Sequence, residues 1–140
     1  MGSRRAGRER ALSLLYEAEA KGLSVDDLLA ELPVAPDPFA LDLVRGVGTG
    51  RERIDAAIAG HAINWEIDRM PAVDRALLRL AVYELMERGD VPVGVVISEA
   101  VELAKQYSTE ESGSFVNGVL AAVAAEERPL ETEVAGRPLD

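Results

Sequence analysis

The stretch from Ile67 to Met86, IDRMPAVDRALLRLAVYELM, constrains the fold more than any other part of the chain. Pro71 suits the first turn of a helix, where its missing N–H leaves no hydrogen bond unmade. The apolar residues that follow form two stripes at helical spacing, namely Val73, Ala76, Leu77, Leu80, Ala81 and Leu85, and then Leu78, Val82, Leu85 and Met86. A helix that is apolar on nearly every side is buried. We therefore expect a central helix from about residue 68 to 86, with the other helices packed around it.

The few polar residues of this stretch carry information because they lie on a buried helix. Asp74 stands at its start beside Asp68, where the helix N-terminus favours carboxylates. Arg75 and Arg79 are four residues apart and share one edge. Glu84 falls within the main apolar stripe, where a charge is costly unless it is paired or close to solvent. These groups are either solvated or paired within the chain, or they face a partner.

Composition excludes several classes of protein. The chain has 140 residues, no cysteine and one histidine, which predicts one domain without disulfides, thiolate metal sites or a histidine-dependent catalytic set. No apolar run approaches the roughly twenty residues of a membrane span, and no signal peptide is evident. We predict a cytoplasmic protein with no membrane association, no enzymatic activity, no metal and no cofactor.

The first ten residues contrast with the rest of this acidic chain, whose net charge is −10. Arginines stand at positions 4, 5, 8 and 10 against one acid, Glu9, in a helix that Ser3 caps and that runs to about Lys21. Positive charge at a helix N-terminus opposes the macrodipole. Such local conflicts concentrate at functional sites, so a bound anion is one explanation.

The remaining pattern predicts an all-α fold. We expect helices over 25–31, from Phe39 to His61 with an interruption by the glycines at 46, 48 and 50, over 95–106, and after a capping region at Ser108. The predicted domain covers 1–128, with subdomains of about 1–61 and 62–128, and 129–140 forms a flexible tail. The glycines offer a rival hypothesis, a nucleotide-binding domain or small hydrolase. However, GVGTG has Arg51 where a third glycine belongs and no strand before it.

The segment S-x-F-V-N-G-V-L, Ser114 to Leu120, is unusual because Asn117-Gly118 interrupts an otherwise good helical run. Phe115 is either a core residue or an exposed ring that stacks on an unpaired base beside amide and hydroxyl groups. The residue pattern alone leaves both interpretations open.

Several motifs together resemble the NusB family of transcription antitermination factors. They are the N-terminal arginines followed by A-L-x-L-L-Y, V-D-R-A-L-L-R-L-A-V-Y-E-L, D-V-P, E-A-V-E-L-A-K and F-V-N-G-V-L, and they cover about residues 4–125 in order. The resemblance implies two small helical bundles packed along a central buried helix. It also implies binding of boxA-type single-stranded RNA together with NusE, a small-subunit ribosomal protein, and delivery to the RNA polymerase elongation complex during synthesis of ribosomal RNA.

The resemblance assigns roles by position. It implies that the RNA-binding residues are Arg4, Arg5, Arg8, Tyr16, Arg79, Glu111, Ser114, Phe115 and Asn117, and that Asp68 and Asp74 face NusE. Family members also form homodimers through the RNA-binding face, so both a monomer and a homodimer are open here. A helical adaptor without an RNA role is a third hypothesis. Four arginines would neutralise about three or four phosphates, which gives salt-sensitive binding.

Overall fold

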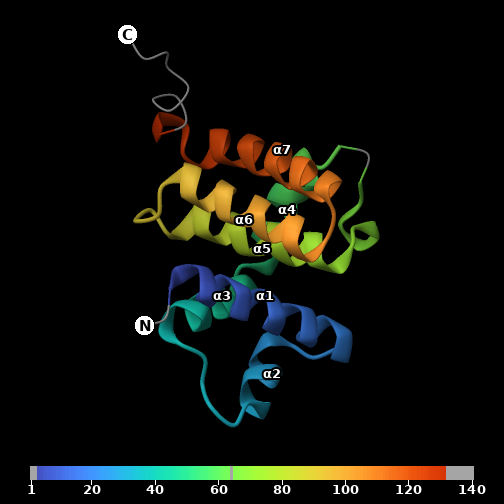
Figure 1. The fold of residues 1–140 in the computed structure, drawn as a ribbon, viewed down its shortest axis with the longest axis vertical. Helices are drawn as coiled ribbons and strands as arrows, with labels where there is room; N and C mark the ends of the chain where they lie inside the picture. Colours follow the sequence, from blue (N-terminus) through green and yellow to red (C-terminus); the bar gives the residue numbers. More distant parts are fainter. Residues whose placement is uncertain (1–2, 64, 132–140) are drawn as a thin grey trace.

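The computed structural model describes residues 3–63 and 65–131. Within these ranges all of the regular secondary structure is helical, as predicted, and the helices form two packed groups (Figure 1). The elements are α1 (Arg4–Lys21), α2 (Val25–Glu31), α3 (Pro38–Thr49), α4 (Arg51–His61), the 3-10 helix η1 (Ile67–Arg69), α5 (Ala72–Glu87), α6 (Val93–Tyr107) and α7 (Glu110–Glu127). None of the described helices is long and apolar enough to span a bilayer.

Helix α5 is the buried centre of the fold. It contacts α1 and α3 on one side and α4, α6 and α7 on the other, so both groups of helices meet along it (Figure 1). Most of its predicted apolar residues are buried, with Leu78 and Val82 fully enclosed and Leu77 and Leu80 at most 3% exposed, while Val73 and Met86 are partly buried. The predicted central helix is thus confirmed, and Pro71 stands at its N-cap rather than in its first turn.

Local capping explains where most helices begin and end. Ser3 caps α1 by accepting a hydrogen bond from the Ala6 N–H at 3.0 Å, and Gly22 ends α1 with φ 66°, a left-handed conformation that glycine adopts without strain. Ser24 caps α2 in the same way. The predicted cap of the last helix, Ser108, is wrong by one residue. Ser108 still closes α6 by donating its N–H to Ala104, so Thr109 caps α7 instead.

The break at the glycines separates the two groups of helices. Helix α3 ends at Thr49 and α4 starts at Arg51, with Gly50 between them. Because α4 packs mainly against α5 and α7, it lies with the C-terminal group (Figure 1). We therefore propose that the division between the subdomains falls at Gly50 rather than near residue 61.

The segment after α7 returns to the end of α5. Arg128 donates hydrogen bonds to the carbonyl oxygens of Glu84, Leu85, Arg88 and Val91 at 2.5–2.9 Å. Glu84 and Leu85 lie in the last turn of α5, where carbonyls run out of helical partners, so the guanidinium acts as a C-terminal cap beside the Arg88 N–H, which also donates to the Glu84 carbonyl. Glu131 pairs with Arg128 and accepts from the Val93 N–H at the start of α6. Of the expected tail, Glu131 is therefore held against the fold, whereas Leu130 is 78% exposed, and 132–140 lie outside the described residues.

Candidate nucleic-acid interface

The first two arginines of α1 are paired with acids from the other group of helices. Arg4 donates to Asp90 at 3.1 Å and Arg5 donates to Glu99 at 2.8 Å, and about half of each arginine side chain remains exposed. The hydrogen bond from Arg88, joined by Arg4, lowers the pKa of Asp90 to about 2. These acids offset the conflict between the arginines and the helix dipole, so the conflict does not by itself require a ligand.

Arg8 is buried rather than exposed. Its guanidinium binds the carboxylate of Glu84 with both Nε and Nη2, at 3.0 and 2.7 Å, and the two side chains are 5% and 2% exposed. Glu84 in the apolar stripe therefore has the partner that its position demands. Phe39 packs against the same guanidinium at 5.2 Å. A Cβ at Gly7 would lie 2.8 Å from the Phe39 ring, so the glycine that interrupts the basic segment allows this packing.

The start of α7 borders a hollow of about 300 Å³, which is completed by α5, by the link between α6 and α7, and by Trp65 and Pro71 from the segment that precedes α5. Asp74, 3% exposed, lines it, and its Oδ2 accepts a hydrogen bond from the Ser112 hydroxyl at 2.8 Å. The other oxygen, Oδ1, is buried and has no hydrogen-bond partner among the described residues. A buried acceptor without a partner costs about 1–3 kcal/mol, so this atom is poised to accept a donor from a ligand.

Aromatic side chains form the apolar wall of the same hollow. Phe115 is partly buried and its ring centroid lies 5.9 Å from that of Trp65, with the planes tilted by 54°. Trp65 is 49% exposed, and Ser114 and Asn117 are exposed on α7 but do not line the hollow. Phe115 therefore combines the two interpretations that the sequence left open, because one part of it packs on the core and another part faces the hollow.

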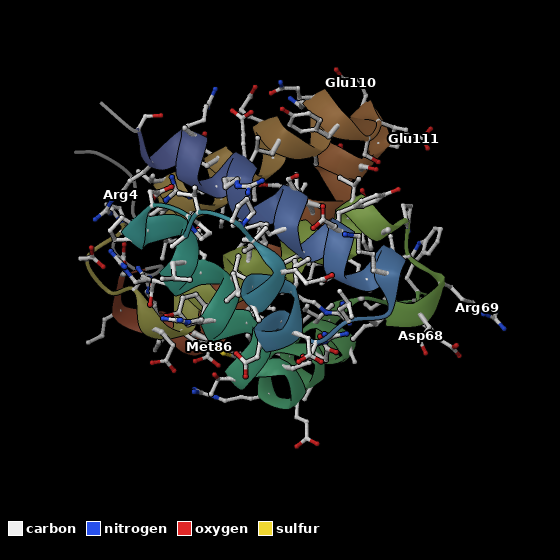
Figure 2. All side chains as sticks on the ribbon, turned by 90° about the horizontal axis from the view of Figure 1, so that it is seen from below. Arg4, Asp68, Arg69, Met86, Glu110 and Glu111 are labelled. Carbon is white, nitrogen blue, oxygen red and sulfur yellow. The ribbon has the colours of Figure 1, made fainter. Side chains whose placement is uncertain are left out.

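The acidic residues at the start of α7 point to solvent. Glu110 and Glu111 lie together at one side of the molecule in Figure 2, and Glu111 also lines the hollow beside Phe115. A carboxylate at this place repels phosphates but accepts hydrogen bonds from base amino groups.

Arg79 lies on another face of α5, away from this hollow. It is 6% exposed, and its guanidinium binds the Asp55 carboxylate of α4 at 2.8 and 3.0 Å, with Glu19 of α1 at 3.6 Å. Arg75 pairs with Glu19 as well. These pairs join α1, α4 and α5, and the structure does not bring Arg79 together with Phe115.

The two aspartates predicted to face NusE are in different environments. Asp68 is exposed on η1 beside Arg69, and Figure 2 shows both at the edge of the molecule opposite Arg4. Asp74 is buried in the hollow at α7. An exposed carboxylate can pair with a basic partner, whereas Asp74 is buried and lines the same hollow as Phe115.

Tyr16 is half-exposed and lines a second groove, of about 520 Å³, between α1 and the end of α6. Sequence reasoning did not single out Tyr107, which lines the same groove and donates a hydrogen bond to Glu9 at 2.8 Å. Arg10 was counted in the basic segment but given no role. Together with Arg45 and Lys105, it has no ion pair with any other described residue. In the sequence, the indication of a role for Arg10 was that it precedes Tyr16 on the same predicted helix.

The described residues do not support the rival hypotheses of a nucleotide-binding domain or a small hydrolase. Gly46 and Gly48 lie inside helix α3, and a Cβ at Gly46 would overlap the ring of Tyr83, so this glycine serves helix packing rather than a phosphate loop. Across residues 3–63 and 65–131, no cluster of histidine and acidic side chains is arranged to hold a metal ion.

Comparison with known proteins agrees with the fold. The NusB family model matches residues 5–125. The chain is 45% identical over 128 residues to transcription antitermination protein NusB of Kineococcus radiotolerans, covering 89% of this chain and 94% of that protein. It is 49% identical over 133 residues to the protein of the same name from Anaeromyxobacter dehalogenans, covering 89% and 93%.

Solved structures extend the likeness to three dimensions. NusB of T. maritima superposes with a TM-score of 0.83 at 34% identity, covering 95% of this chain and 98% of that one. A chain from a crystal structure of antitermination factors NusB and NusE in complex with dsRNA superposes with a TM-score of 0.73 at 32% identity, covering 88% and 96%. This chain therefore belongs to the NusB family of transcription antitermination proteins, which are not enzymes.

Proposed function

We propose that this protein binds boxA-type single-stranded RNA together with NusE and carries both to the RNA polymerase elongation complex in the cytoplasm. The complex supports processive, antiterminated transcription of ribosomal RNA. The solved relative in complex with NusE and dsRNA supports NusE and RNA as partners, and we infer the polymerase from the antitermination role of the family relatives.

The hollow at the start of α7 is the observation that supports RNA binding. It combines a buried carboxylate oxygen without a partner, on Asp74, with the rings of Phe115 and Trp65. An unpaired base offers a flat face for stacking and N–H donors at its edge. The hydroxyls of Ser108 and Thr109 at the same opening add donors and acceptors. The hollow thus fits a base better than it fits an apolar ligand.

The proposed binding of NusE rests on charge. The chain is acidic overall, at −10, and Asp68 and Glu66 lie exposed around η1. Ribosomal proteins are basic, so an acidic surface favours their approach and orientation. We propose Asp68 as a NusE contact, and we assign Asp74 to the RNA side because it lines the hollow beside Phe115.

The test separates the two surfaces. Phe115→Ala should weaken boxA binding by about 1–3 kcal/mol, the value of one base–aromatic stack, and leave NusE affinity unchanged. Asp68→Lys should weaken NusE binding and leave RNA binding of the free protein unchanged or stronger. Each affinity is measured by titration, beside the unfolding midpoint of each variant.

The same experiment decides between the proposal and its rivals. A purely structural adaptor predicts no measurable boxA affinity for the unaltered protein. If both variants lose both partners while remaining folded, the division into two surfaces is wrong. Sedimentation of the free protein shows whether a homodimer covers the RNA surface.

A further inference from the structure

A groove of about 420 Å³ lies between α3, α4 and the last turns of α5, at the break where Gly50 separates α3 from α4. Its volume falls within the roughly 300–1,000 Å³ of ligand pockets. Ile54, Tyr83 and Met86 supply an apolar lining, with Ile54 almost fully buried and the other two partly buried. Because binding sites form preferentially where two packed units meet, this groove is a candidate contact surface.

The groove is separate from the surfaces discussed above. Asp74 of the hollow and Tyr83 of the groove both lie on α5, and nine positions at about 100° each place them on opposite sides of that helix. The hollow and the groove share no lining residue. Figure 2 shows Met86 well apart from Asp68 and from Glu111. Neither the proposed RNA contact nor the proposed NusE contact therefore uses this groove.

The ring of Tyr83 is a fixed part of the lining. Its hydroxyl donates a hydrogen bond to Asp42 at 2.9 Å, and Asp42 is itself paired with Arg88 at 3.0 Å. Burial and this hydrogen bond raise the pKa of Tyr83 to about 12, so the ring stays uncharged. A Cβ at Gly46 would overlap the ring, so the glycine lets α3 approach it. A preformed surface of this kind binds without the cost of ordering its side chains.

Arg45 gives the groove a cation without a partner. It is exposed on α3, and its side chain has no ion pair or hydrogen bond with any other residue that the structure describes. Arg53, which also lines the groove, is shared between Glu87 at 3.2 Å and Glu127 at 3.6 Å. The groove thus combines one unpaired positive charge with an apolar lining, on a chain whose net charge is −10.

These features fit an acidic segment of another protein. One apolar side chain of such a segment fills a groove of this size, and a neighbouring carboxylate pairs with Arg45. A basic partner finds no free acid in the lining, because Glu87 is already bound to Arg53. RNA carries a phosphate at every nucleotide, and Glu87 and Glu127 repel the phosphates that follow the first. A single carboxylate avoids both conflicts.

We propose that the groove between α3, α4 and α5 docks an acidic segment of a protein partner, with an apolar side chain against Tyr83 and Met86 and a carboxylate on Arg45. The apolar side chain supplies most of the affinity, and the charge pair fixes the orientation. Because the surface is separate from those proposed for RNA and NusE, the protein holds this partner while both of them are bound.

The first experiment selects short random peptides displayed on phage against the whole protein. Enriched peptides should carry a leucine, methionine or aromatic residue close to an acid. Arg45→Ala should lower their affinity about tenfold, as for one lost charged hydrogen bond, whereas Arg45→Lys keeps the charge and should retain more. Arg10→Ala is the matched control, because Arg10 is also exposed and without an ion pair among the described residues but lies on α1. No enrichment, or losses that are equal for Arg45→Ala and Arg10→Ala, would overturn the site.

The second experiment blocks the groove. Thr49→Trp fills it from an exposed position at the end of α3, so it should lower the affinity of the selected peptides about tenfold and leave the unfolding midpoint nearly unchanged. Thr49→Ser is the control and should keep full affinity. Full binding by Thr49→Trp would place the peptide elsewhere. A homodimer that Thr49→Trp dissociates would make a second copy of the chain the occupant instead.

The third experiment separates this site from the proposed function. In isotope-labelled protein, a selected peptide should shift the amide NMR signals of Gly46 and Thr49 and leave those of Ser112 and Phe115 in place. boxA RNA should do the reverse, and the two should bind together. If RNA displaces the peptide or shifts the Gly46 and Thr49 signals, this inference fails and the proposed function stands. If the peptide binds at the groove but boxA RNA does not bind at all, the proposed function fails and this inference stands.

Discussion

The start of α1 and the start of α7 were both predicted to contact RNA, but they differ in whether their polar groups already have partners within the chain. Arg4, Arg5 and Arg8 each bind an acid from elsewhere in the chain, and Arg8 is almost fully enclosed. At α7, Phe115 faces a hollow and one oxygen of Asp74 lacks a partner. A count of charges in a sequence therefore does not measure their availability, since an internal partner can satisfy a basic residue as well as a phosphate does.

Replacing Arg8 should produce the largest effect and should act on stability. Arg8→Ala leaves Glu84 buried without its partner, which typically costs about 3–5 kcal/mol of unfolding free energy. Denaturant unfolding measures the loss. The double variant Arg8→Met with Glu84→Leu should recover much of it, because it removes both charges together. A stable Arg8→Ala protein with poor RNA binding would instead make Arg8 a surface contact.

Replacing Asp74 should act on binding more than on stability. Asp74→Asn keeps the shape and an oxygen for Ser112 but presents an amide N–H₂ in place of the free acceptor. A hydrogen bond to a charged group contributes about 1.5–3 kcal/mol, so boxA affinity should fall by about that amount. Calorimetric titration gives the affinity, and thermal unfolding serves as the control. Unchanged affinity would exclude the carboxylate from base recognition.

Replacing Glu99, which competes with RNA for Arg5, should strengthen RNA binding slightly. Glu99→Gln frees Arg5 from an ion pair that is about half-exposed on the arginine side, and such pairs contribute about 0.2–1 kcal/mol. RNA affinity should rise by at most about fivefold, with a steeper salt dependence. Glu102→Gln on the same helix removes the same charge from a residue that has no ion pair among the described residues, and it serves as the control. An equal gain in both variants would attribute the effect to net charge alone.

Acid should loosen the start of α1 in a defined pH range. The pKa of Asp90 falls from 3.8 to about 2 because Arg88 and Arg4 bind its charged form. Its contribution to stability is therefore complete above about pH 4 and is lost as the pH falls through 2. Asp90→Asn should flatten the stability profile between these values, and the effect should be small because the pair is exposed. An unchanged profile would show that other carboxylates dominate acid unfolding.

Much of the fold was predictable because local physics determines it. The caps Ser3 and Ser24, the stop at Gly22 and the apolar periodicity of α5 act within a few residues, and each was confirmed. The cap of α7 was not, because Ser108 and Thr109 are equally good local candidates. The length of α6 decides between them, and Ser108 is used to end that helix.

The candidate site was predictable in its residue types and less so in their arrangement. The sequence by itself determined that the chain is helical, that α5 is central, and that arginines and an aromatic polar segment stand at particular positions. Only the tertiary structure decided which arginines are free, because Glu84, Asp90 and Glu99 are distant in sequence and reach α1 through packing of the helices. It likewise brought Tyr107 and Tyr16 to the same groove and placed the buried Asp74 in the same hollow as Phe115. Ion pairing and burial depend on distances between helices, and one-dimensional patterns do not contain those distances.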